Sequence, residues 1–377
     1  MGMLMEYGRS GFRMGEAQLQ TELARSALQQ YGMQDANVAL IRARGGGTLV
    51  FRATSAGTGE DFLLKMYLPP RSQRKVVSRS EDALRSQLLW QSALRREAEL
   101  PVQEPVPTSE GELTSIARVE GVEEDRIAVL MSWVPGEQKA PEELRRKELR
   151  MMGAHAARLH RHAESYAHPE GFLRPRWGWR STFGGSRPLW RRGREFYSSE
   201  EMAVFRAASE YVRRDLRSLG KGSEVFGLIH RDIQAKNLIF DGGRVHAIDF
   251  ESCGWGHYLF DLALISLRLE WRGEEHAGLH EALLEGYRQV RPLSRDHEQY
   301  LETFAVMRIV ERLNVLLRLE DPASHHQGRT YLPEAARRLE RFVQSKRNRG
   351  ARRLFPVRAR DGLGRLKTAL YPRRTAL

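Results

Sequence analysis

The segment LIHRDIQAKNLIFDGGRVHAIDF, residues 228–250, places His230, Asp232, Asn237 and Asp249 around two short apolar runs. Carboxylates beside buried segments are costly unless they are paired or hold a cation. Asparagine and aspartate oxygens suit a hard cation such as Mg²⁺, which takes few protein ligands and fills its coordination sphere with phosphate oxygens. A further carboxylate held apart from the cation can accept a proton from a hydroxyl nucleophile, as phosphoryl transfer requires. The alternative is a structural turn whose polar groups satisfy one another.

A β-hairpin would bring these side chains together. The runs NLIF and VHAID flank the sequence DGG at 241–243, which predicts two strands joined by a short glycine turn. Because a hairpin returns the chain on itself, Asn237 before the first strand is expected to lie beside Asp249 at the end of the second. Asp232 is expected on the loop that precedes the hairpin.

The rest of the chain divides into two halves of different character. Alternation of apolar residues predicts strands at 37–44, 48–54, 62–67, 114–119 and 126–134, with helices at 15–32 and 78–97. Helical periodicity then predicts helices at 141–164, 200–218, 258–270, 275–290, 296–319 and 332–345. A mostly β half therefore precedes a mostly α half.

The order His230-x-Asp232-x-x-x-x-Asn237, followed by Asp249, resembles the catalytic core of the protein-kinase-like superfamily. The run DFESCGWGHYLFDLAL, in which Asp261 follows Asp249 by twelve residues, resembles the aminoglycoside phosphotransferase/choline kinase branch. Within that branch the neighbourhood looks most like bacterial stress-response kinase and homoserine-kinase-like members. The resemblance spans residues 36–345 and implies an α+β, bilobal protein-kinase-like fold, with a β-rich N-terminal lobe and a helical C-terminal lobe.

The resemblance also implies roles for single residues. Asp232 matches the catalytic base that orients the acceptor hydroxyl, and Asn237 and Asp249 match the two metal ligands. His230 matches a structural support of the loop. Asp261 matches a residue that ties this loop to the following helix; its alternative interpretation is a carboxylate at a helix start, favoured by the helix dipole.

On the nucleotide side, Lys65 in DFLLKMY matches the lysine that contacts the α- and β-phosphates, although a lysine in an amphipathic strand is usually solvated. The implied cofactors are Mg²⁺ and ATP, with GTP as an alternative donor. Three glycines occupy the expected phosphate-covering turn, where backbone amides approach an anion, unless they form only a hairpin; they are Gly45, Gly46 and Gly47. The inter-lobe hinge that would present backbone to adenine, or else a buried strand end, consists of Met131, Ser132, Trp133 and Val134.

Two positions depart from the family pattern. Relatives usually pair the strand lysine with a glutamate on the next helix, where this chain has the neutral Gln87. Glutamine can still hydrogen-bond the lysine but provides no charge pairing, and Glu81 lies on a different helix face. This departure motivates a nucleotide-binding pseudokinase as an alternative. The second departure is Arg231, where small-molecule kinases of this branch often carry glycine.

The acceptor is less constrained by the sequence. The short distance from Asp249 to the helix expected near Tyr258 leaves no room for a long activation segment, which favours a small-molecule acceptor over a protein acceptor. The loop FLRPRWGWRSTFGGSRPLWRRGREFY either recognises an anionic or protein acceptor, or is a solvated loop anchored by its tryptophans. Its basic and tryptophan residues are Arg174, Arg176, Trp177, Trp179, Arg180, Arg187, Trp190, Arg191, Arg192 and Arg194. These arginines disfavour a polycationic aminoglycoside.

The net charge of +13 is concentrated at the C-terminus. Residues 341–377 carry twelve Lys/Arg and the single acid Asp361, which leaves 49 basic and 47 acidic residues elsewhere. The tail at 346–377 is expected to be loosely ordered, and to act either as a tether for polyanions or as a solubilising arm. The lone Cys253, and the lack of an apolar run long enough for a signal peptide or a membrane span, predict a cytoplasmic protein.

We therefore expect an enzyme that moves the γ-phosphate of Mg·ATP to a hydroxyl group of a small molecule. The alternatives are a Ser/Thr protein kinase of the stress-response type, or a pseudokinase with a polyanion-binding tail. The expected organisation is a nucleotide-binding lobe at 1–131, a hinge at 132–136, a helical catalytic and acceptor lobe at 137–345 and a basic tail at 346–377.

Overall fold

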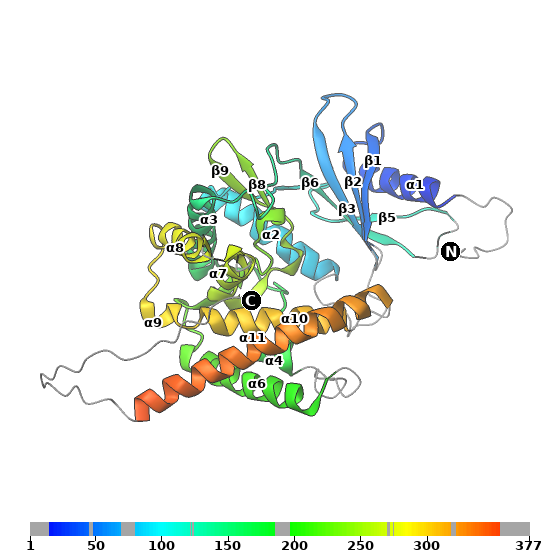
Figure 1. Cartoon of the computed structure of the whole chain (residues 1–377). Coiled ribbons are helices and arrows are strands. Elements are labelled where there is room, and N and C mark those ends of the chain that lie inside the picture. Colours follow the sequence, from blue (N-terminus) through cyan, green and yellow to red (C-terminus); the bar gives the residue numbers. More distant parts are fainter. Residues whose placement is uncertain are drawn as a thin grey trace, which may run out of the picture.

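The computed structural model describes residues 15–44, 48–68, 80–120, 122, 124–184, 197–269, 272–273, 275–317 and 322–354. An antiparallel sheet with two helices forms the N-terminal part, and helices dominate the remainder (Figure 1). The predicted glycine turn at 45–47, part of the arginine loop and the tail beyond residue 354 lie outside the described residues.

The N-terminal sheet has the strand order β1-β2-β3-β6-β4, and β5 also pairs with β6. Its strands are β1 (Asn37–Arg44), β2 (Thr48–Thr54), β3 (Asp61–Tyr67), β4 (Pro105–Val106), β5 (Ser115–Ala117) and β6 (Arg126–Ser132), and every pairing is antiparallel. Successive side chains of a strand point to opposite faces. Leu64 and Met66 of β3 therefore share a core with α1 (Glu16–Gln29), while Tyr67 packs with α2 (Glu81–Ala98) on the other face. Lys65 shares the face of Tyr67.

The helical part surrounds a single large apolar core. Its helices are α3 (Arg146–Ser165), α4 (Trp179–Phe183), α6 (Ser199–Leu219), α7 (Leu259–Leu267), α8 (Glu275–Arg288), α9 (Arg295–Glu298), α10 (Leu301–Leu316) and α11 (Pro322–Leu354). Almost every side chain of α7 is buried, because α3, α8 and α10 all pack against it. A small strand pair, β7 (Phe226–Ile229) with β10 (Gly254–His257), flanks residues 230–253 in the chain.

The predicted hairpin is present as β8 (Leu238–Asp241) and β9 (Arg244–Ala247). Gly242 and Gly243 both have positive φ angles, as a two-residue hairpin turn requires. Short 3₁₀ turns precede and follow the hairpin, η3 (Ala235–Asn237) and η4 (Phe250–Ser252). The hairpin therefore carries Asn237 and Asp249 at its two ends, as predicted.

Chain segments from the N-terminal half hold this hairpin on both edges. Glu137, just after the sheet, exchanges two backbone hydrogen bonds with Phe240 of β8, at 3.0 and 2.8 Å. Residues 101–103 exchange hydrogen bonds with Ala247 of β9. Gly136 has a φ of 115°, and a Cβ there would lie 2.5 Å from the Phe240 carbonyl oxygen, so glycine is required for this close approach.

The structure differs from the prediction at several elements. The helix expected at 296–319 is two helices, α9 and α10, and the β7–β10 pair was not predicted. The boundary expected at residue 345 falls inside α11, so residues 346–354 belong to a helix and not to a loose tail. Tertiary contacts extend this helix, because Lys346 pairs with Asp215 of α6 and Arg349 pairs with Glu302 of α10 at 2.7 Å.

None of the helices in the described ranges is long and apolar enough to cross a membrane.

Two buried histidines predict how stability depends on pH. Burial lowers the pKa of His155 to about 3, with nearby positive charge adding to the effect. Burial also lowers the pKa of His257 to about 4, although its hydrogen bond to the Gly220 carbonyl opposes the shift. Both side chains are therefore neutral in the folded protein near pH 6.5, whereas the unfolded chain takes up protons as the pH falls below that value.

We expect the free energy of unfolding to fall between about pH 6.5 and pH 4, by ~1.4 kcal/mol per pH unit for each of the two histidines. Urea denaturation at a series of pH values measures this slope. His155→Gln should flatten it, whereas substitution of the exposed His326 by glutamine should leave it unchanged. Equal slopes in all three proteins would contradict the assignment.

Candidate functional site

A cleft of about 520 Å³ lies between the N-terminal sheet and the β8–β9 hairpin. Val50 and Leu63 of the sheet and Ile239 and Ile248 of the hairpin contribute apolar lining to it. Lys65, Asn237 and Asp249 line the same cleft, so it combines an apolar slot with a charged and polar end. Such a slot suits a planar ring system attached to an anion.

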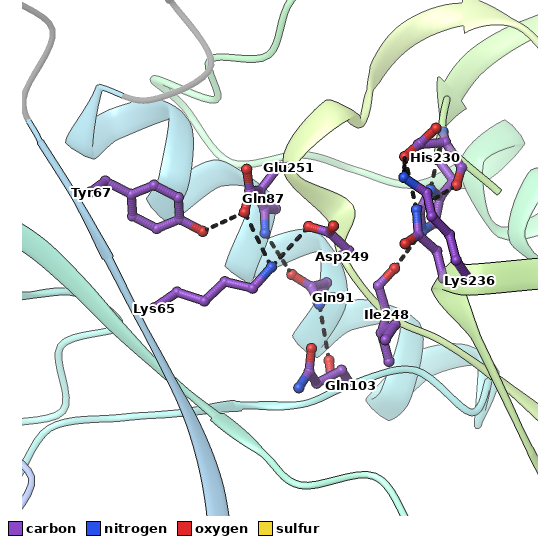
Figure 2. Close-up of polar contacts among 12 residues, drawn as sticks. Lys65, Tyr67, Gln87, Gln91, Gln103, His230, Lys236, Ile248, Asp249 and Glu251 are labelled. Atoms are coloured by element: carbon purple, nitrogen blue, oxygen red, sulfur yellow. Dashed lines mark hydrogen bonds and ion pairs between the residues drawn. The ribbon is translucent and has the colours of Figure 1, made fainter. Parts of the chain in front are cut away.

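Lys65 is nearly buried and pairs with two carboxylates. Its Nζ lies 2.8 Å from Asp249 Oδ1 and 3.1 Å from Glu251 Oε1 (Figure 2). Burial by itself would lower the pKa of Lys65, but Asp249 and Glu251 outweigh it and raise the pKa, so the ammonium group stays charged. The Tyr67 hydroxyl donates a hydrogen bond to Glu251 Oε1 at 3.0 Å and fixes that carboxylate.

Gln87 was expected to hydrogen-bond Lys65, but in the structure its side chain makes a different hydrogen bond. Its side-chain nitrogen donates to Gln91, which in turn donates to the Gln103 carbonyl, and its own oxygen is buried without a hydrogen-bond donor. Glu81 lies elsewhere and accepts a hydrogen bond from the Thr114 hydroxyl. The acidic partner of Lys65 is instead Glu251, two residues after Asp249, which the sequence reasoning missed.

Asn237 and Asp249 fit the role of two ligands for a hard cation. The Asn237 side-chain nitrogen donates to the Asp232 carbonyl oxygen at 2.8 Å and to Asp232 Oδ2 at 2.9 Å. These partners assign the amide orientation and leave Asn237 Oδ1 as the atom that can bind a cation. Within the part of the chain that the structure describes, no group of three or more His, Cys, Asp or Glu side chains could hold a metal. Two protein ligands suit Mg²⁺, which keeps most of its coordination sites for water and phosphate.

Asp232 is held by donors on several sides. Gln234 Nε2 donates to Oδ1 at 2.6 Å, and Asn237 donates to Oδ2. Arg308 of α10 also approaches Oδ1 at 3.3 Å. A carboxylate restrained in this way has a fixed direction, which a general base needs.

Asp261, in the first turn of α7, organises the loop that carries Asp232. Its fully buried carboxylate accepts hydrogen bonds from the backbone amides of His230 at 2.9 Å and Arg231 at 2.7 Å. It also lies 3.2 Å from His160 Nε2. Burial lowers the pKa of His160 despite the adjacent carboxylate, so the imidazole is neutral and donates from Nε2. The predicted contact between this loop and the following helix is therefore present.

His230 supports the same loop from the other side. Its Nδ1 accepts from the Asp232 amide at 3.3 Å, and its Nε2 lies 3.0 Å from the Ile248 carbonyl oxygen, so these partners place the proton on Nε2. The ring therefore joins the Asp232 loop to the residue that precedes Asp249.

Arg231 occupies a left-handed backbone conformation, with a φ of 67°. Glycine adopts such angles at no steric cost, which explains why relatives can carry glycine there. The arginine side chain is held in place, because its guanidinium lies 3.5 Å from the centre of the Trp177 ring and 3.0 Å from Glu311 of α10. These contacts offset the backbone strain and tie the loop to α10.

Only part of the predicted hinge faces the cleft. Trp133 and Val134 line it, whereas Met131 is buried in the core between the sheet and α2. The Ser132 amide donates to the Glu104 carbonyl, and the Ser132 carbonyl accepts from the Gln103 side chain.

Arg174 of the predicted arginine loop is a structural residue. Its buried guanidinium donates to the backbone carbonyls of Ala83, Glu251 and Cys253, so it is not available to an acceptor. Trp177 and Trp179 anchor the loop through their ring nitrogens, as the alternative interpretation expected. Arg176 and Arg180 are exposed. The remaining members, Arg187, Trp190, Arg191, Arg192 and Arg194, lie outside the described residues, as do Gly45, Gly46 and Gly47.

Comparison with known proteins agrees with this architecture. A sequence model of the phosphotransferase enzyme family matches residues 40–302. Amicoumacin kinase of Bacillus subtilis (strain 168) is 27% identical over 78 residues, which is 21% of this chain and 23% of that protein, so the match spans about a quarter of the relative.

Two solved structures share the fold over most of the chain. The microcompartment-associated aminopropanol kinase has a TM-score of 0.71 at 24% identity and covers 86% of this chain and 98% of its own. The amicoumacin kinase hAmiN, in complex with AMP-PNP, Ca²⁺ and Ami, has a TM-score of 0.67 at 17% identity and covers 85% of this chain and 93% of its own. The predicted α+β protein-kinase-like fold is therefore confirmed.

Substitution Asp261→Asn tests how far the loop depends on this carboxylate. An amide nitrogen would face at least one backbone N–H that now donates to Asp261, and losing a hydrogen bond to a charged group costs about 1.5–3 kcal/mol. We expect faster hydrogen exchange at the His230 and Arg231 amides and a lower free energy of unfolding. The matched control is Asp296→Asn on the exposed surface of α9, which should change neither quantity. Unchanged exchange in Asp261→Asn would show that the loop is held by other contacts.

Proposed function

Because the chain belongs to the phosphotransferase enzyme family, we propose that it transfers the γ-phosphate of Mg·ATP to a hydroxyl group of a small-molecule acceptor. The observation that supports this proposal best is the convergence of Lys65, Asn237 and Asp249 on one cleft, with Asp232 hydrogen-bonded to Asn237. The structure of the amicoumacin kinase hAmiN contains AMP-PNP and Ca²⁺, which agrees with a nucleotide in this cleft.

In this proposal each part of the cleft has a separate task. The apolar lining from Val50, Leu63, Ile239 and Ile248 binds the base, and the charged Lys65 binds phosphate oxygens. Trp133 and Val134 place backbone groups at the edge of the base. A Mg²⁺ ion held by Asn237 and Asp249 would neutralise charge on the phosphates.

Asp232 acts on the acceptor. The hydroxyl oxygen forms a bond to the γ-phosphorus while the bond from that phosphorus to the β–γ bridging oxygen breaks, and the hydroxyl proton passes to the Asp232 carboxylate. The products are ADP and a phosphate ester. Gln234 and Asn237 hold the carboxylate in a fixed direction for this step.

Two observations place this function ahead of its alternatives. Residues 250–257 form η4 and β10, and α7 begins at Leu259, which leaves no long activation segment of the kind that regulated protein kinases use. Gln87 motivated a pseudokinase, but Glu251 supplies the acidic partner of Lys65 that the helix lacks. We therefore favour an active small-molecule kinase over a protein kinase or a nucleotide-binding scaffold.

Calorimetric titration of ATP, with and without Mg²⁺, tests the nucleotide site. We expect binding that requires Mg²⁺ and that is lost in Asp249→Ala, because this variant removes one of two cation ligands. Asp241→Ala, which removes an exposed carboxylate from the turn of the same hairpin, should bind like the unaltered protein. Metal-independent binding would favour the pseudokinase, and no binding to the unaltered protein would contradict the proposal.

A phosphate-transfer screen with hydroxyl-bearing metabolites and generic protein acceptors tests the chemistry. With the best acceptor found, Asp232→Ala should lower kcat by ~10²–10⁴-fold, the usual contribution of a general base. Its affinity for Mg·ATP should fall far less than its kcat, since Asp232 reaches the nucleotide site only through its hydrogen bonds with Asn237, one of which uses the backbone carbonyl and remains. A loss of less than tenfold in kcat would remove Asp232 from the role of base.

A further inference from the structure

A second cavity, of about 460 Å³, is lined in part by Gln234, Ala235 and Lys236, which follow Asp232 in the chain. Gln138 and Lys236 line both cavities, and Gln138 Nε2 donates to the Lys236 carbonyl at the junction between them. The charged side chains that line the second cavity are Lys139, Lys236 and Arg268, all of them basic. We refer to it below as the basic pocket.

The side chain of Gln234 connects the basic pocket to Asp232, the proposed base. Gln234 lines the pocket and donates a hydrogen bond to Asp232 Oδ1 at 2.6 Å. Lys236 lies 3.6 Å from Asp232 Oδ2. A molecule bound in the pocket therefore lies next to the Gln234 and Lys236 side chains that contact Asp232.

Among the described residues around Asp232 and the basic pocket, basic side chains outnumber carboxylates. Arg308 is shared between Asp232 at 3.3 Å and Glu311 at 3.6 Å. Glu311 also pairs with Arg231. The two carboxylates of Asp232 and Glu311 therefore share three basic partners, which are Arg231, Lys236 and Arg308. Arg312, one turn further along α10, stacks on the Tyr331 ring at 4.5 Å.

Arg268, which caps the C-terminus of α7, is the cation of the pocket with the least compensation. Among the described residues no carboxylate pairs with it, whereas Lys139 has Glu148 at 3.2 Å. Arg268 is an exposed residue at the edge of the pocket. Desolvation lowers its pKa and the guanidinium groups of Arg308 and Arg312 lower it further, while Asp232 opposes the shift. Like charges gathered in a partly enclosed pocket repel one another, and an anion that binds among them relieves this repulsion.

We infer that the acceptor is an alcohol that also carries an anionic group, a carboxylate or a phosphate, bound in the basic pocket by Arg268 with its hydroxyl at Asp232. This inference rests on the proposed function, because it assumes that Asp232 receives the hydroxyl proton. Arg268 anchors the anion through its planar guanidinium, while Arg308 and Lys236 contribute positive charge beside it. The same charges disfavour an acceptor with an ammonium group near its hydroxyl.

Four three-carbon alcohols with the same two adjacent hydroxyls test this selectivity: glycerol, glycerate, glycerol phosphate and aminopropanediol. Each is titrated calorimetrically into the full chain saturated with Mg·AMP-PNP. We expect glycerate or glycerol phosphate to bind, and the neutral and cationic members to bind at least about tenfold more weakly, since a hydrogen bond to a charged group contributes about 1.5–3 kcal/mol. The comparison of glycerate with glycerol phosphate separates a carboxylate from a phosphate site.

Substitution Arg268→Gln should weaken binding of the preferred anion about 10- to 100-fold while leaving the affinity for Mg·AMP-PNP unchanged. Arg268→Lys, which keeps the charge, should retain part of the affinity. The matched control is Arg337→Gln, an exposed arginine on α11 outside the pocket.

Three results of the ligand titrations would overturn the inference while the nucleotide site stands. They are equal binding of glycerol and the anions, preferential binding of aminopropanediol, and absence of anion binding to a protein that does bind Mg·AMP-PNP. Unchanged anion affinity in Arg268→Gln would also overturn it, because the anion would then lie elsewhere. Failure of the unaltered protein to bind Mg·AMP-PNP would instead contradict the proposed function itself.

Discussion

The buried carboxylate of Asp261 is the contact on which the geometry of the candidate site depends. It accepts the backbone amides of His230 and Arg231, and so fixes the start of the loop that carries Asp232 and leads into the hairpin. Leaving two amides unpaired in this apolar setting would be costly, and a lone buried carboxylate would be costlier still. Other helices enclose α7, which carries Asp261, so the loop is held against a rigid element. The left-handed conformation of Arg231 is tolerable because this support, and the Trp177 and Glu311 contacts, restrict its alternatives.

Charged side chains are compensated by nearby partners, and the pattern differs between the cleft that contains Lys65 and the region around Asp232. On the nucleotide side, Lys65 is paired with Asp249 and Glu251, and Tyr67 restrains Glu251. The glutamate that relatives usually place on the helix after the third strand is replaced here by one on the segment that follows Asp249. On the other side, basic side chains outnumber carboxylates around Asp232. In the proposed function, lysine and a divalent cation balance the charge of the nucleotide, and arginine is left for a second anionic molecule.

The element types and the central residues of the site could be predicted from the sequence, because both depend on local patterns. Strand alternation and helical periodicity report which side chains will be buried, and the DGG turn between two apolar runs specifies the hairpin that brings Asn237 and Asp249 together. The spacing of His230, Asp232 and Asn237 on one short loop needs no distant contact. The contact of Asp261 with that loop followed from the same family pattern.

Other features depend on residues far apart in the chain, and only the tertiary structure decided them. Lys65 and Glu251 are separated by 186 positions, so no local pattern could show that Glu251 takes the place expected for Gln87. Arg174 looked like a candidate for acceptor binding, but its environment is a set of backbone carbonyls that folding brings around it. The part of α11 beyond residue 345 makes ion pairs with α6 and α10, which lie far from it in the sequence. By itself the sequence determined which residues are candidates for the chemistry, because their types and local spacing are set by the covalent chain. The partners that compensate each charge were decided by tertiary packing, because electrostatic compensation depends on distance in space.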